Sequence, residues 1–580
     1  MAENDPRHNS SVDLLQALRA IVGDNHAHDD GPTVRRYASS TAGATAGTLP
    51  LAVVRPGTRD EVIAIMALAS RHGVPVYPLS TGRNWGYGDA CAVGAGQLIV
   101  ELSRMNRIVK VDPQLAYAVI EPGVTQGQLS SYLREHGIGL WCDCTGAGPD
   151  TSLVGNILER GFGHSPYGNR VRHIAGMQIV LAGGELLATG FGHYRQSQVT
   201  HLFDAGVGPM LDGLFTQSNL GVVVELGLWL MPAAACVSQF VATVGRQHEL
   251  GALIEALRPL RLDGTLRSVV HIGNDLRVLS GGATFPFAGA GRPDGVGSAG
   301  PPASSPANAP SSLLSDSARR AMIERSGAQA WTVSGCLYGS AAQVAAGRAA
   351  VRRALRQAGA RVDFIDQRRL DAVGAVARLL GRFNLGARLP GKVALGRALL
   401  AMAQGIPNGR FLAGAYWRRR GGLPADFPAA ANPALDGCGL LWVSPILPMR
   451  GADAIALHAL VAPLFASHGF DLFITFSLVN ERALCAVLTI AFDRDDAAES
   501  ERARACHRAV FDTVMEAGYP PYRVGIESMG ALDPDGDVFW KVAGRIKAAL
   551  DPRGLIAPGR YEPAVARRLS WRSLEGRRPP

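Results

Sequence analysis

At 580 residues the chain is too long for a single hydrophobic core, so we expect two or more domains, each large enough to enclose a sizeable ligand. Its 47% hydrophobic and 18% charged residues are ordinary for a globular protein. The net charge of +9 comes mostly from scattered arginines without interleaved aromatic residues, so nucleic acid is not an expected partner. Anionic small molecules fit this charge equally well.

Signals for a membrane or an oxidising compartment are not evident in the sequence. The amino terminus, MAENDPRHNSS, is polar, and no run of about 18 apolar residues occurs, so neither a signal peptide nor a membrane span is expected. The eight cysteines have no regular spacing, and Cys142 and Cys144 form CxC rather than the CxxC pairs of a zinc site. We therefore expect a cytoplasmic protein with reduced thiols and no metal site.

The predicted elements begin with an amphipathic helix, VDLLQALRAIV, and a polar tether, which together occupy residues 1–48. From Leu49 the sequence LAVVRPGTRDEVIAIMALASRHGVPVYPLS predicts a strand, a helix and a second strand. Thr58 is the expected N-cap of that helix, which ends before Gly73. The second strand leads directly into a glycine-rich loop, PLSTGRNWGYG, at residues 78–88.

Further strands are predicted in LIVELS, AYAVIEPG and GMQIVLAGGELLATG, the last with a Gly-Gly hairpin signal. Between them TQGQLSSYLREHG predicts a helix with a glycine stop. An apolar strand that ends at Pro232 completes a mixed α/β domain over residues 49–233.

A second domain is expected over residues 234–500, where strands and helices alternate again. It is interrupted at 286–316 by a stretch rich in Gly, Pro, Ala and Ser, which we expect to be a disordered loop. Residues 501–565 resume helix and loop signals, and residues 566–580 form a basic tail.

Three loops of the first domain have the composition of a ligand site. In PLSTGRNWGYG, backbone N–H groups freed by glycines can converge on an anion, although the loop matches neither standard nucleotide fingerprint and a purely structural turn is the alternative. A second run, residues 145–170, contains Gly161, Gly163 and Gly168, which let the backbone approach a flat ligand. Asn219 and Gly221 mark the third loop. Three such loops in one domain are hard to explain as turns alone.

Taken together, PLSTGRNWGYG, EPGVTQGQL, VGNILERGFGHSPYGNR, GLFTQSNLGVVVELGLWLMP and LDPRGLIAPGRY resemble the vanillyl-alcohol oxidase and p-cresol methylhydroxylase family of FAD-linked oxidases. The resemblance extends in order from about residue 45 to 565. It implies an α+β fold, in which a PCMH-type FAD-binding domain has two parts, residues 49–233 and 501–565, with an α+β substrate (cap) domain inserted between them.

The resemblance also implies the residues that bind FAD. The first loop would hold the pyrophosphate through its backbone, and the second would line the rest of the cofactor. The expected cofactor-binding residues are Ser80, Thr81, Gly82, Arg83, Asn84, Trp85, Gly86, Pro149, Ser152, Gly155, Asn156, Glu159, Arg160, Gly161, Gly163, Gly221, Val223 and Arg560.

Phenol-oxidising members of the family bind the phenolate oxygen of the substrate with two tyrosines and an arginine. The matching residues here are Tyr87, in NWGYG, and Tyr522 with Arg523, in GYPPYRVG. Two phenolic donors and a permanent cation would stabilise an oxyanion in a desolvated cavity. The phenolate would then favour hydride loss from the benzylic carbon to the flavin. The alternative is that Tyr87 packs in the core while the other two serve a surface turn.

The chain departs from the family where the flavin is usually attached. The matching position in VNERALCAVLTIAF is Cys485 or Ala486, neither of which is the usual His or Tyr, so we predict FAD that is bound without a covalent bond. A bond through Cys144, beside the second loop, is the alternative.

The acid/base group also departs from the family. Where alcohol-oxidising relatives have an aspartate beside the flavin, DCTGAGPDTS places Ala147, with Asp143 and Asp150 nearby. Glu481, four residues before Cys485, matches a glutamate that assists water addition in the methylhydroxylase, and we take it as the candidate base. The alternative is that Glu481 forms a salt bridge at the end of a strand. His164 and His173 are expected to be satisfied by backbone hydrogen bonds, and Trp85 to narrow the pocket or stack on a ring.

The predicted activity is therefore oxidation of a para-substituted phenol at its benzylic carbon through a quinone methide, with a hydroxylated or dehydrogenated product. The electron acceptor is expected to be either dioxygen or a c-type cytochrome, since relatives use both, and a homodimer is considered because dimers are common in the family. One alternative keeps FAD but replaces the phenol with an alcohol or another group on a larger natural product. The other is a non-catalytic FAD-binding component of a complex.

Overall fold

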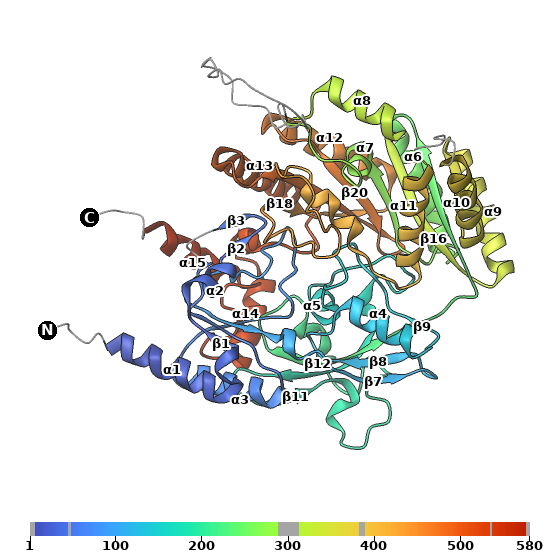
Figure 1. Cartoon of the computed structure of the whole chain (residues 1–580). Helices are drawn as coiled ribbons and strands as arrows, with labels where there is room; N and C mark the ends of the chain where they lie inside the picture. Colours follow the sequence, from blue (N-terminus) through green and yellow to red (C-terminus); the bar gives the residue numbers. More distant parts are fainter. Residues whose placement is uncertain (1–5, 45–47, 288–312, 382–388, 534–535, 576–580) are drawn as a thin grey trace, which may run out of the picture.

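A computed structural model of the chain describes residues 6–44, 48–287, 313–381, 389–533 and 536–575. Figure 1 shows two layers, a first domain below, in blue to cyan with the red carboxyl-terminal helices beside it, and a cap domain above, in green to orange. The α+β fold with an inserted cap that the sequence predicts is confirmed by this arrangement.

A four-stranded sheet forms one half of the first domain. Its order is β1 (Ala27–His28), β4 (Ala52–Val54), β6 (Leu98–Glu101) and β5 (Val76–Leu79). Helix α3 (Arg59–His72) connects β4 to β5, which confirms the predicted strand, helix and strand. The Thr58 hydroxyl accepts the Glu61 N–H at 3.2 Å to begin the helix, and Gly73 ends it at φ 67°.

A five-stranded antiparallel sheet forms the other half. Its order is β11 (Leu186–Ala188), β10 (Ile174–Val180), β12 (Val222–Trp229), β8 (Tyr117–Ile120) and β7 (Ile108–Asp112). The predicted Gly-Gly hairpin is the β10–β11 turn. Helices α4 (Gln126–Glu135) and α5 (Leu153–Leu158) pack on this sheet around a shared apolar core. A short pair, β9 (Leu140–Trp141) and β13 (Met231–Pro232), completes the domain.

The amino-terminal segment is more ordered than the sequence predicted. Helix α1 (Pro6–Val22) contains the expected amphipathic stretch and buries Leu14 and Leu18. The polar tether expected after it is wrong for residues 23–44, because Ala27 pairs with Val54 at the edge of the four-stranded sheet. Helix α2 (Gly31–Arg36) and the pair β2 (Ser39–Ser40) and β3 (Gly43–Ala44) fill the rest of that segment.

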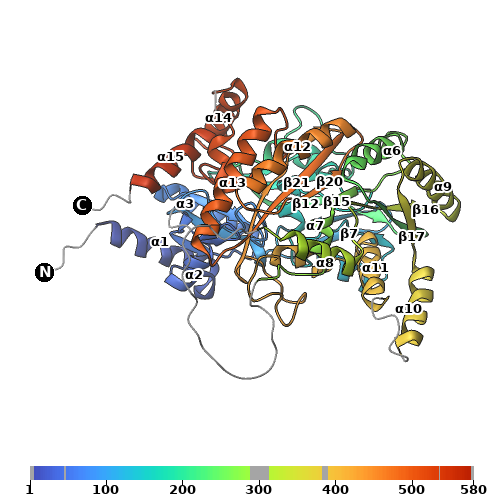
Figure 2. The same cartoon turned by 90° about the horizontal axis from the view of Figure 1, so that it is seen from above.

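The cap domain is built on an eight-stranded antiparallel sheet. Its order is β17 (Arg361–Ile365), β14 (Cys236–Val244), β16 (Trp331–Gly339), β15 (Val270–Asn274), β20 (Phe473–Leu478), β21 (Ala483–Asp493) and β18 (Cys438–Val443), with β19 (Ile446–Pro448) also on β21. Helices α9 (Ala341–Gln357), α6 (Leu250–Leu262), α12 (Gly451–Ser467) and α13 (Ala497–Glu516) cover one face and contact one another in that order (Figure 2).

The two faces of the cap sheet differ in chemistry because successive side chains alternate between them. Ile272, Phe476 and Leu488 face the helices and belong to the apolar core. Their neighbours His271 and Ser477 face the first domain. The cap sheet therefore presents a polar face to the space between the domains.

Other helices of the cap surround the edges of this sheet. They are α7 (Asp275–Leu279), α8 (Asp316–Ser326), α10 (Gln367–Gly381), α11 (Leu389–Ala403) and the 3-10 segment η8 (Gly409–Tyr416). The loop expected at 286–316 lies, for residues 288–312, outside the described residues.

Two expected domain limits need correction. The boundary at residue 500 falls inside α13, whose residues Cys506 and Val510 belong to the cap core, so the cap extends through this helix. The chain then returns to the first domain, where Ile556 forms a parallel bridge with Val76 beside β5. Helices α14 (Val538–Leu550) and α15 (Pro563–Glu575) follow, and α15 includes the beginning of the expected basic tail at residue 566.

Within the described part of the chain, no helix has the length and apolar character to cross a membrane.

A buried ion pair joins the segment after η8 to α13. The Arg418 guanidinium donates to both carboxylate oxygens of Glu499, at 2.9 and 2.7 Å, and Glu499 also accepts the Asp493 N–H at 2.9 Å. Both side chains are almost completely buried. Removing one charge would leave the other without compensation.

We therefore predict that Glu499→Ala lowers the free energy of unfolding of the cap by about 3–5 kcal/mol, measured by urea denaturation. Glu501→Ala on the same helix is the control, because Glu501 is exposed and its ion pairs lie at the surface. We expect it to change stability by less than about 0.5 kcal/mol. Equal losses in the two variants would contradict this assignment.

Candidate active site

A cavity of about 570 Å³ lies where the first domain, the cap sheet and the returning carboxyl-terminal segment meet. All three glycine-rich loops reach it. The predicted cofactor-binding residues that line the cavity are Ser80, Thr81, Gly82, Arg83, Asn84, Trp85, Ser152, Gly155, Asn156, Glu159, Gly161, Gly163, Gly221, Val223 and Arg560. Loops that are far apart in the sequence therefore converge on one space, as expected.

The first loop follows β5 and turns back through glycines. At Gly86 φ is +73°, and a Cβ would lie 2.9 Å from the Trp442 ring, so only glycine fits there without strain. Its N–H donates to the Thr41 hydroxyl at 3.1 Å and its carbonyl accepts the Trp442 N–H at 3.2 Å. Gly86 is not among the lining residues and its backbone has a structural role, so the expectation that it binds the cofactor stays a prediction without support from the cavity lining. Trp85 lines the cavity, and its indole N–H donates to the Ala147 carbonyl at 3.3 Å.

The second loop is packed tightly enough to place its backbone at the cavity wall. At Gly161 and Gly163 a Cβ would overlap the Asn156 and Asp143 side chains, so the backbone there must stay bare. Gly155 has the same constraint against the Ser80 hydroxyl, at 2.9 Å. Bare backbone and polar side chains along a deep cavity fit the flat, anionic cofactor that the family resemblance implies.

Two other predicted cofactor residues lie elsewhere. The Pro149 carbonyl accepts the Gly127 N–H at 2.8 Å, and the Arg160 side chain donates to the Thr216 hydroxyl at 3.2 Å. Neither residue lines the cavity, because both bond to structure behind the loop. The cavity lining therefore does not support the expectation that Pro149 and Arg160 bind the cofactor, which stays a prediction.

A buried ion pair joins the second loop to the carboxyl-terminal segment. Arg560 bonds to Glu159 and donates to the Tyr77 hydroxyl at 2.8 Å, while the Tyr561 hydroxyl donates to Glu159 at 2.8 Å. Burial alone would raise the pKa of Glu159, but the charges of Arg560 and Arg523 outweigh it and the pKa is lowered. Glu159 therefore stays ionised and fixes the cation that faces the cavity.

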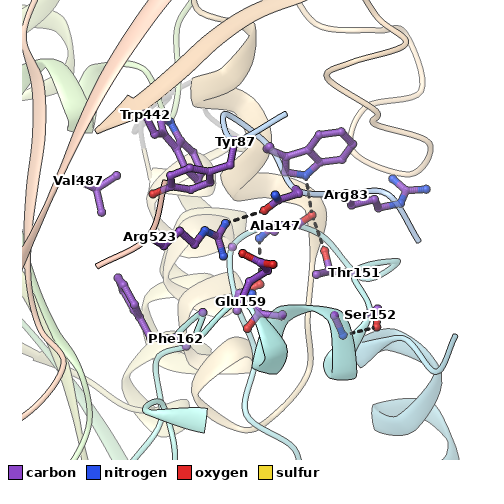
Figure 3. A pocket seen from close by; sticks show the side chains of 18 of the residues that line it. Arg83, Tyr87, Ala147, Thr151, Ser152, Glu159, Phe162, Trp442, Val487 and Arg523 are labelled. Atoms are coloured by element: carbon purple, nitrogen blue, oxygen red, sulfur yellow. Dashed lines mark hydrogen bonds between the residues drawn. The ribbon is translucent and has the colours of Figure 1, made fainter. Parts of the chain in front are cut away.

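The three residues expected to bind a phenolate lie together at the cavity, and Arg523 lies near Glu159 (Figure 3). The Arg523 guanidinium lies 4.0 Å from the centre of the Tyr87 ring and 6.0 Å from that of Tyr522. It donates to the Asn84 side chain at 2.9 Å, and the Tyr87 hydroxyl lies 2.6 Å from that of Ser444. Figure 3 shows Tyr87, Trp442, Val487 and Phe162 grouped around Arg523.

Burial sets the protonation of this group. It raises the pKa of Tyr87 and of Tyr522, against the opposing effect of Arg523, so both hydroxyls keep their protons and can donate. For Arg523 burial would lower the pKa, but Tyr522, Tyr87 and Glu159 outweigh it and the pKa is raised. The Nε of Arg523 is buried without a hydrogen-bond partner among the described residues. The group is thus an arrangement of donors with spare capacity for one oxyanion.

Glu481 does not join this group. It lies in the turn between β20 and β21, its side chain is 47% exposed, and it pairs with Arg261 at 3.8 Å and Arg482 at 3.9 Å. It does not line the cavity. The cavity lining does not support the expectation of a catalytic base: β21 begins at Ala483, two residues after Glu481, so Glu481 stays in the turn and forms salt bridges at the strand end.

The acid/base position of alcohol-oxidising relatives holds no carboxylate here. Ala147 lines the cavity as expected, Asp150 pairs with Arg83 at 3.0 Å, and Asp143 forms a buried pair with Arg170 at 2.7 Å. Burial would raise the pKa of Asp143, but Arg170 and the Ser165 N–H lower it. Both aspartates are committed to structural contacts.

Residues of the cap sheet that the sequence reading missed form the opposite wall. They are Gln239, His271, Thr332, Ser334, Trp442, Thr475, Ser477, Val487 and Thr489, and nearby α7 contributes Arg277. The alternation of polar and apolar residues in VVHIGN and FITFSL could have predicted these residues, because it indicates strands with one polar face.

His164 behaves differently from the expectation, whereas His173 lies away from the cavity. The His164 ring faces the cavity 4.7 Å from that of His271, and no hydrogen bond to its ring occurs among the described residues. His173 stacks on Tyr167 at 4.1 Å. Burial lowers the pKa of His164 and, further, that of His271, so both imidazoles are neutral near pH 7.

The cysteines considered for flavin attachment are both buried. Ala486 faces the cap core, which resolves the alternative in favour of Cys485 as the residue on the cavity side of β21. Cys485 is nevertheless not a lining residue, and burial raises the pKa of its thiol. Cys144 packs in the core of the first domain, and its thiol points to the Cys142 carbonyl at 3.7 Å. Neither is placed or ionised as a nucleophile.

Comparison with known proteins supplies the cofactor and the family. Residues 50–190 match a model of an FAD binding domain. The chain is 36% identical to 1'-carboxy-chondrochloren decarboxylase from Chondromyces crocatus, over 94% of this chain and 96% of that protein. The structure of p-cresol methylhydroxylase with substrate bound has a TM-score of 0.80 at 27% identity, over 96% of this chain and 97% of that one. The 4-ethylphenol oxidase from Gulosibacter chungangensis, in its isoeugenol complex, has a TM-score of 0.81 at 25% identity, over 95% and 97%.

We predict that the FAD of this protein is held without a covalent bond. Acid precipitation of the purified protein will leave the flavin in the supernatant, because the buried thiol of Cys485 is protonated and no His or Tyr replaces it. A pellet that stays yellow would contradict the prediction. Loss of that colour in Cys485→Ser would then identify the attachment.

Proposed function

The chain belongs to the vanillyl-alcohol oxidase and p-cresol methylhydroxylase family of FAD-linked oxidoreductases, and from this membership we propose that it oxidises the benzylic carbon of a para-substituted phenol. The observation that carries the proposal is the convergence of Tyr87, Tyr522 and Arg523 at one end of the cavity. Two protonated hydroxyls and a fixed cation would bind a phenolate and favour its ionisation over the neutral phenol.

The chain itself would position and polarise the substrate. The Tyr87, Tyr522 and Arg523 donors hold the oxygen, Phe162 and Trp442 bound the ring, and the cap sheet excludes water. Electron density from the phenolate then reaches the para carbon, which weakens the benzylic C–H bond toward hydride loss. When bound in the loops that contain Ser80, Asn84 and Gly161, FAD supplies the acceptor for that hydride and its two electrons. The substrate is left as a quinone methide.

We predict that Arg523→Met lowers the rate of anaerobic flavin reduction by a 4-alkylphenol about 10²–10³-fold, because one charged donor to the oxyanion is lost. Tyr522→Phe will lower it less, since a neutral donor is removed. Stopped-flow absorbance of the flavin measures the rate. Arg508→Met is the control, because Arg508 is 61% exposed on α13 and distant from the cavity lining. Equal rates in Arg523→Met and the control would overturn the proposed role.

A second candidate function is oxidative decarboxylation of a larger, carboxylated phenol. The 36% identical relative is named a decarboxylase that acts on a carboxylated natural product. Among the described residues that line the cavity, only Glu159 and Asp89 carry a carboxyl group that would act as a base for water addition. Glu159 pairs with Arg560, and Asp89 accepts the Thr41 N–H. Burial raises the pKa of Asp89 to about 7.

Such a reaction balances with the same hydride loss. If the carbon next to the benzylic carbon carries a carboxylate, the quinone methide is an electron sink. The C–C bond to the carboxylate breaks, its electron pair forms the alkene as the ring regains aromaticity, and CO₂ leaves. The net change is loss of one hydride and one CO₂ from the phenolate.

We predict that 3-(4-hydroxyphenyl)propanoate labelled with ¹³C in its carboxyl group releases labelled CO₂ and 4-vinylphenol in equal amounts with flavin reduced. Mass spectrometry of a single anaerobic turnover measures both products. Reduction of the flavin with the label retained in a hydroxylated or unsaturated acid would reject this candidate and keep the first.

A further inference from the structure

We propose that Arg277 binds a carboxylate of the substrate and so sets the substrate class as para-substituted phenols whose side chain bears an acid. The inference rests on the proposed function only for the phenol end of the substrate. The evidence for the anion site comes from the surroundings of Arg277 and does not depend on that function.

Arg277 extends from α7, and two glycines leave space for its side chain. It lies in α7 directly after β15, and its N–H donates to the capping side chain of Asn274 at 3.1 Å. A Cβ at Gly414 would lie 2.7 Å from its Nη1, and a Cβ at Gly273 would lie 3.4 Å from its Cγ. Both glycines leave room for the side chain, and Arg277 lines the cavity.

The Arg277 guanidinium has no counter-ion among the described residues. Burial is the sole influence on its pKa, which is lowered, and no carboxylate raises it. Asp275, its nearest acidic neighbour in sequence, is taken by Arg319 through bonds of 2.7, 2.8 and 2.9 Å. By contrast, the buried guanidiniums of Arg170 and Arg418 each bond to a buried carboxylate. Arg277 is half-buried at the cavity, and a cation withdrawn from bulk water without a partner is unfavourable unless a ligand supplies the opposite charge.

Neutral polar groups with unused hydrogen-bonding capacity surround this cation. His271 Nε2 and Thr475 Oγ1 are buried without hydrogen-bond partners among the described residues. Both side chains face the cavity from adjacent strands, and Gly273, whose space Arg277 uses, pairs with Thr475. His271 is neutral, in part because of the Arg277 charge, so the site holds one positive charge and suits one anion. A carboxylate, with two oxygens and several lone pairs, satisfies the guanidinium and these neighbours together.

The spacing of the two cations fits one molecule. Arg277 follows β15, whereas Tyr87 bonds to Ser444, directly after β18. Two strands, β20 and β21, lie between β15 and β18. At about 4.8 Å per strand, the end of β15 and the end of β18 are about 14 Å apart. The side chains of Arg277 and Arg523 shorten the gap between the two cations. A phenol with a short acidic chain in the para position spans this gap.

The test uses three probes on the FAD-loaded protein: 3-(4-hydroxyphenyl)propanoate, its methyl ester, and 3-phenylpropanoate. Dissociation constants are read from the change in the flavin spectrum under anaerobic conditions, alongside the FAD content of each variant. We expect Arg277→Met to weaken binding of the two acids about 10- to 100-fold while the ester changes less than about twofold. Arg277→Lys will recover part of the loss, because it keeps the charge without the planar fork.

Arg320→Met is the matched control, since Arg320 is exposed on α8 and does not line the cavity. Equal weakening of acid and ester in Arg277→Met, or loss of FAD instead of selectivity, would overturn the proposal. Failure of every phenol to reduce the flavin would reject the proposed function alone, because 3-phenylpropanoate still reports on Arg277. Wild-type protein that binds the acids no better than the ester would reject the carboxylate site.

Discussion

One buried cation, Arg523, lies beside the rings of Tyr87 and Tyr522 and connects the parts of the site. The carboxyl-terminal segment carries it there, and backbone hydrogen bonds fix the approach: the Tyr522 N–H donates to the Ser444 carbonyl at 3.1 Å and the Ile526 N–H to that of Tyr87 at 3.3 Å. The segment thereby ties the first loop of the first domain to β18 of the cap. Among the described residues no carboxylate forms an ion pair with Arg523, because Glu159, the carboxylate that acts on it, bonds to Arg560, and an oxyanion would therefore bind there favourably.

The cap sheet supplies the second constraint through the period of its strands. One face packs against four helices through apolar residues such as Ile272 and Phe476. Their neighbours in sequence, His271 and Ser477, face the cavity. The same strands therefore stabilise the cap and shape the site. Because the polar face includes groups without hydrogen-bond partners among the described residues, a polar substrate that supplied those partners would bind favourably.

The sequence predicted the parts of the site that lie in long motifs and missed those that depend on tertiary contacts. Tyr87, Tyr522 and Arg523 were predicted to lie together because motif and chemistry agreed, and their role in substrate binding stays a prediction. Arg277 was not predicted, since a lone arginine in a short helix gives no local signal, and its proposed role comes from the lack of a counter-ion among the described residues. Glu481 was misplaced because spacing along a strand does not reveal where the strand ends, and residues 23–44 were read as a tether because strands of two residues have no periodicity.

If the protein binds its substrate as a phenolate, a bound phenol will be ionised at a pH where the free phenol is neutral. 4-Hydroxybenzaldehyde can be titrated into the flavoprotein one pH unit below its own pKa, and its ultraviolet difference spectrum recorded. We expect the phenolate spectrum for the bound ligand in the wild type and the neutral spectrum in Arg523→Met, because burial alone favours the neutral form. A neutral spectrum in the wild type would contradict phenolate binding.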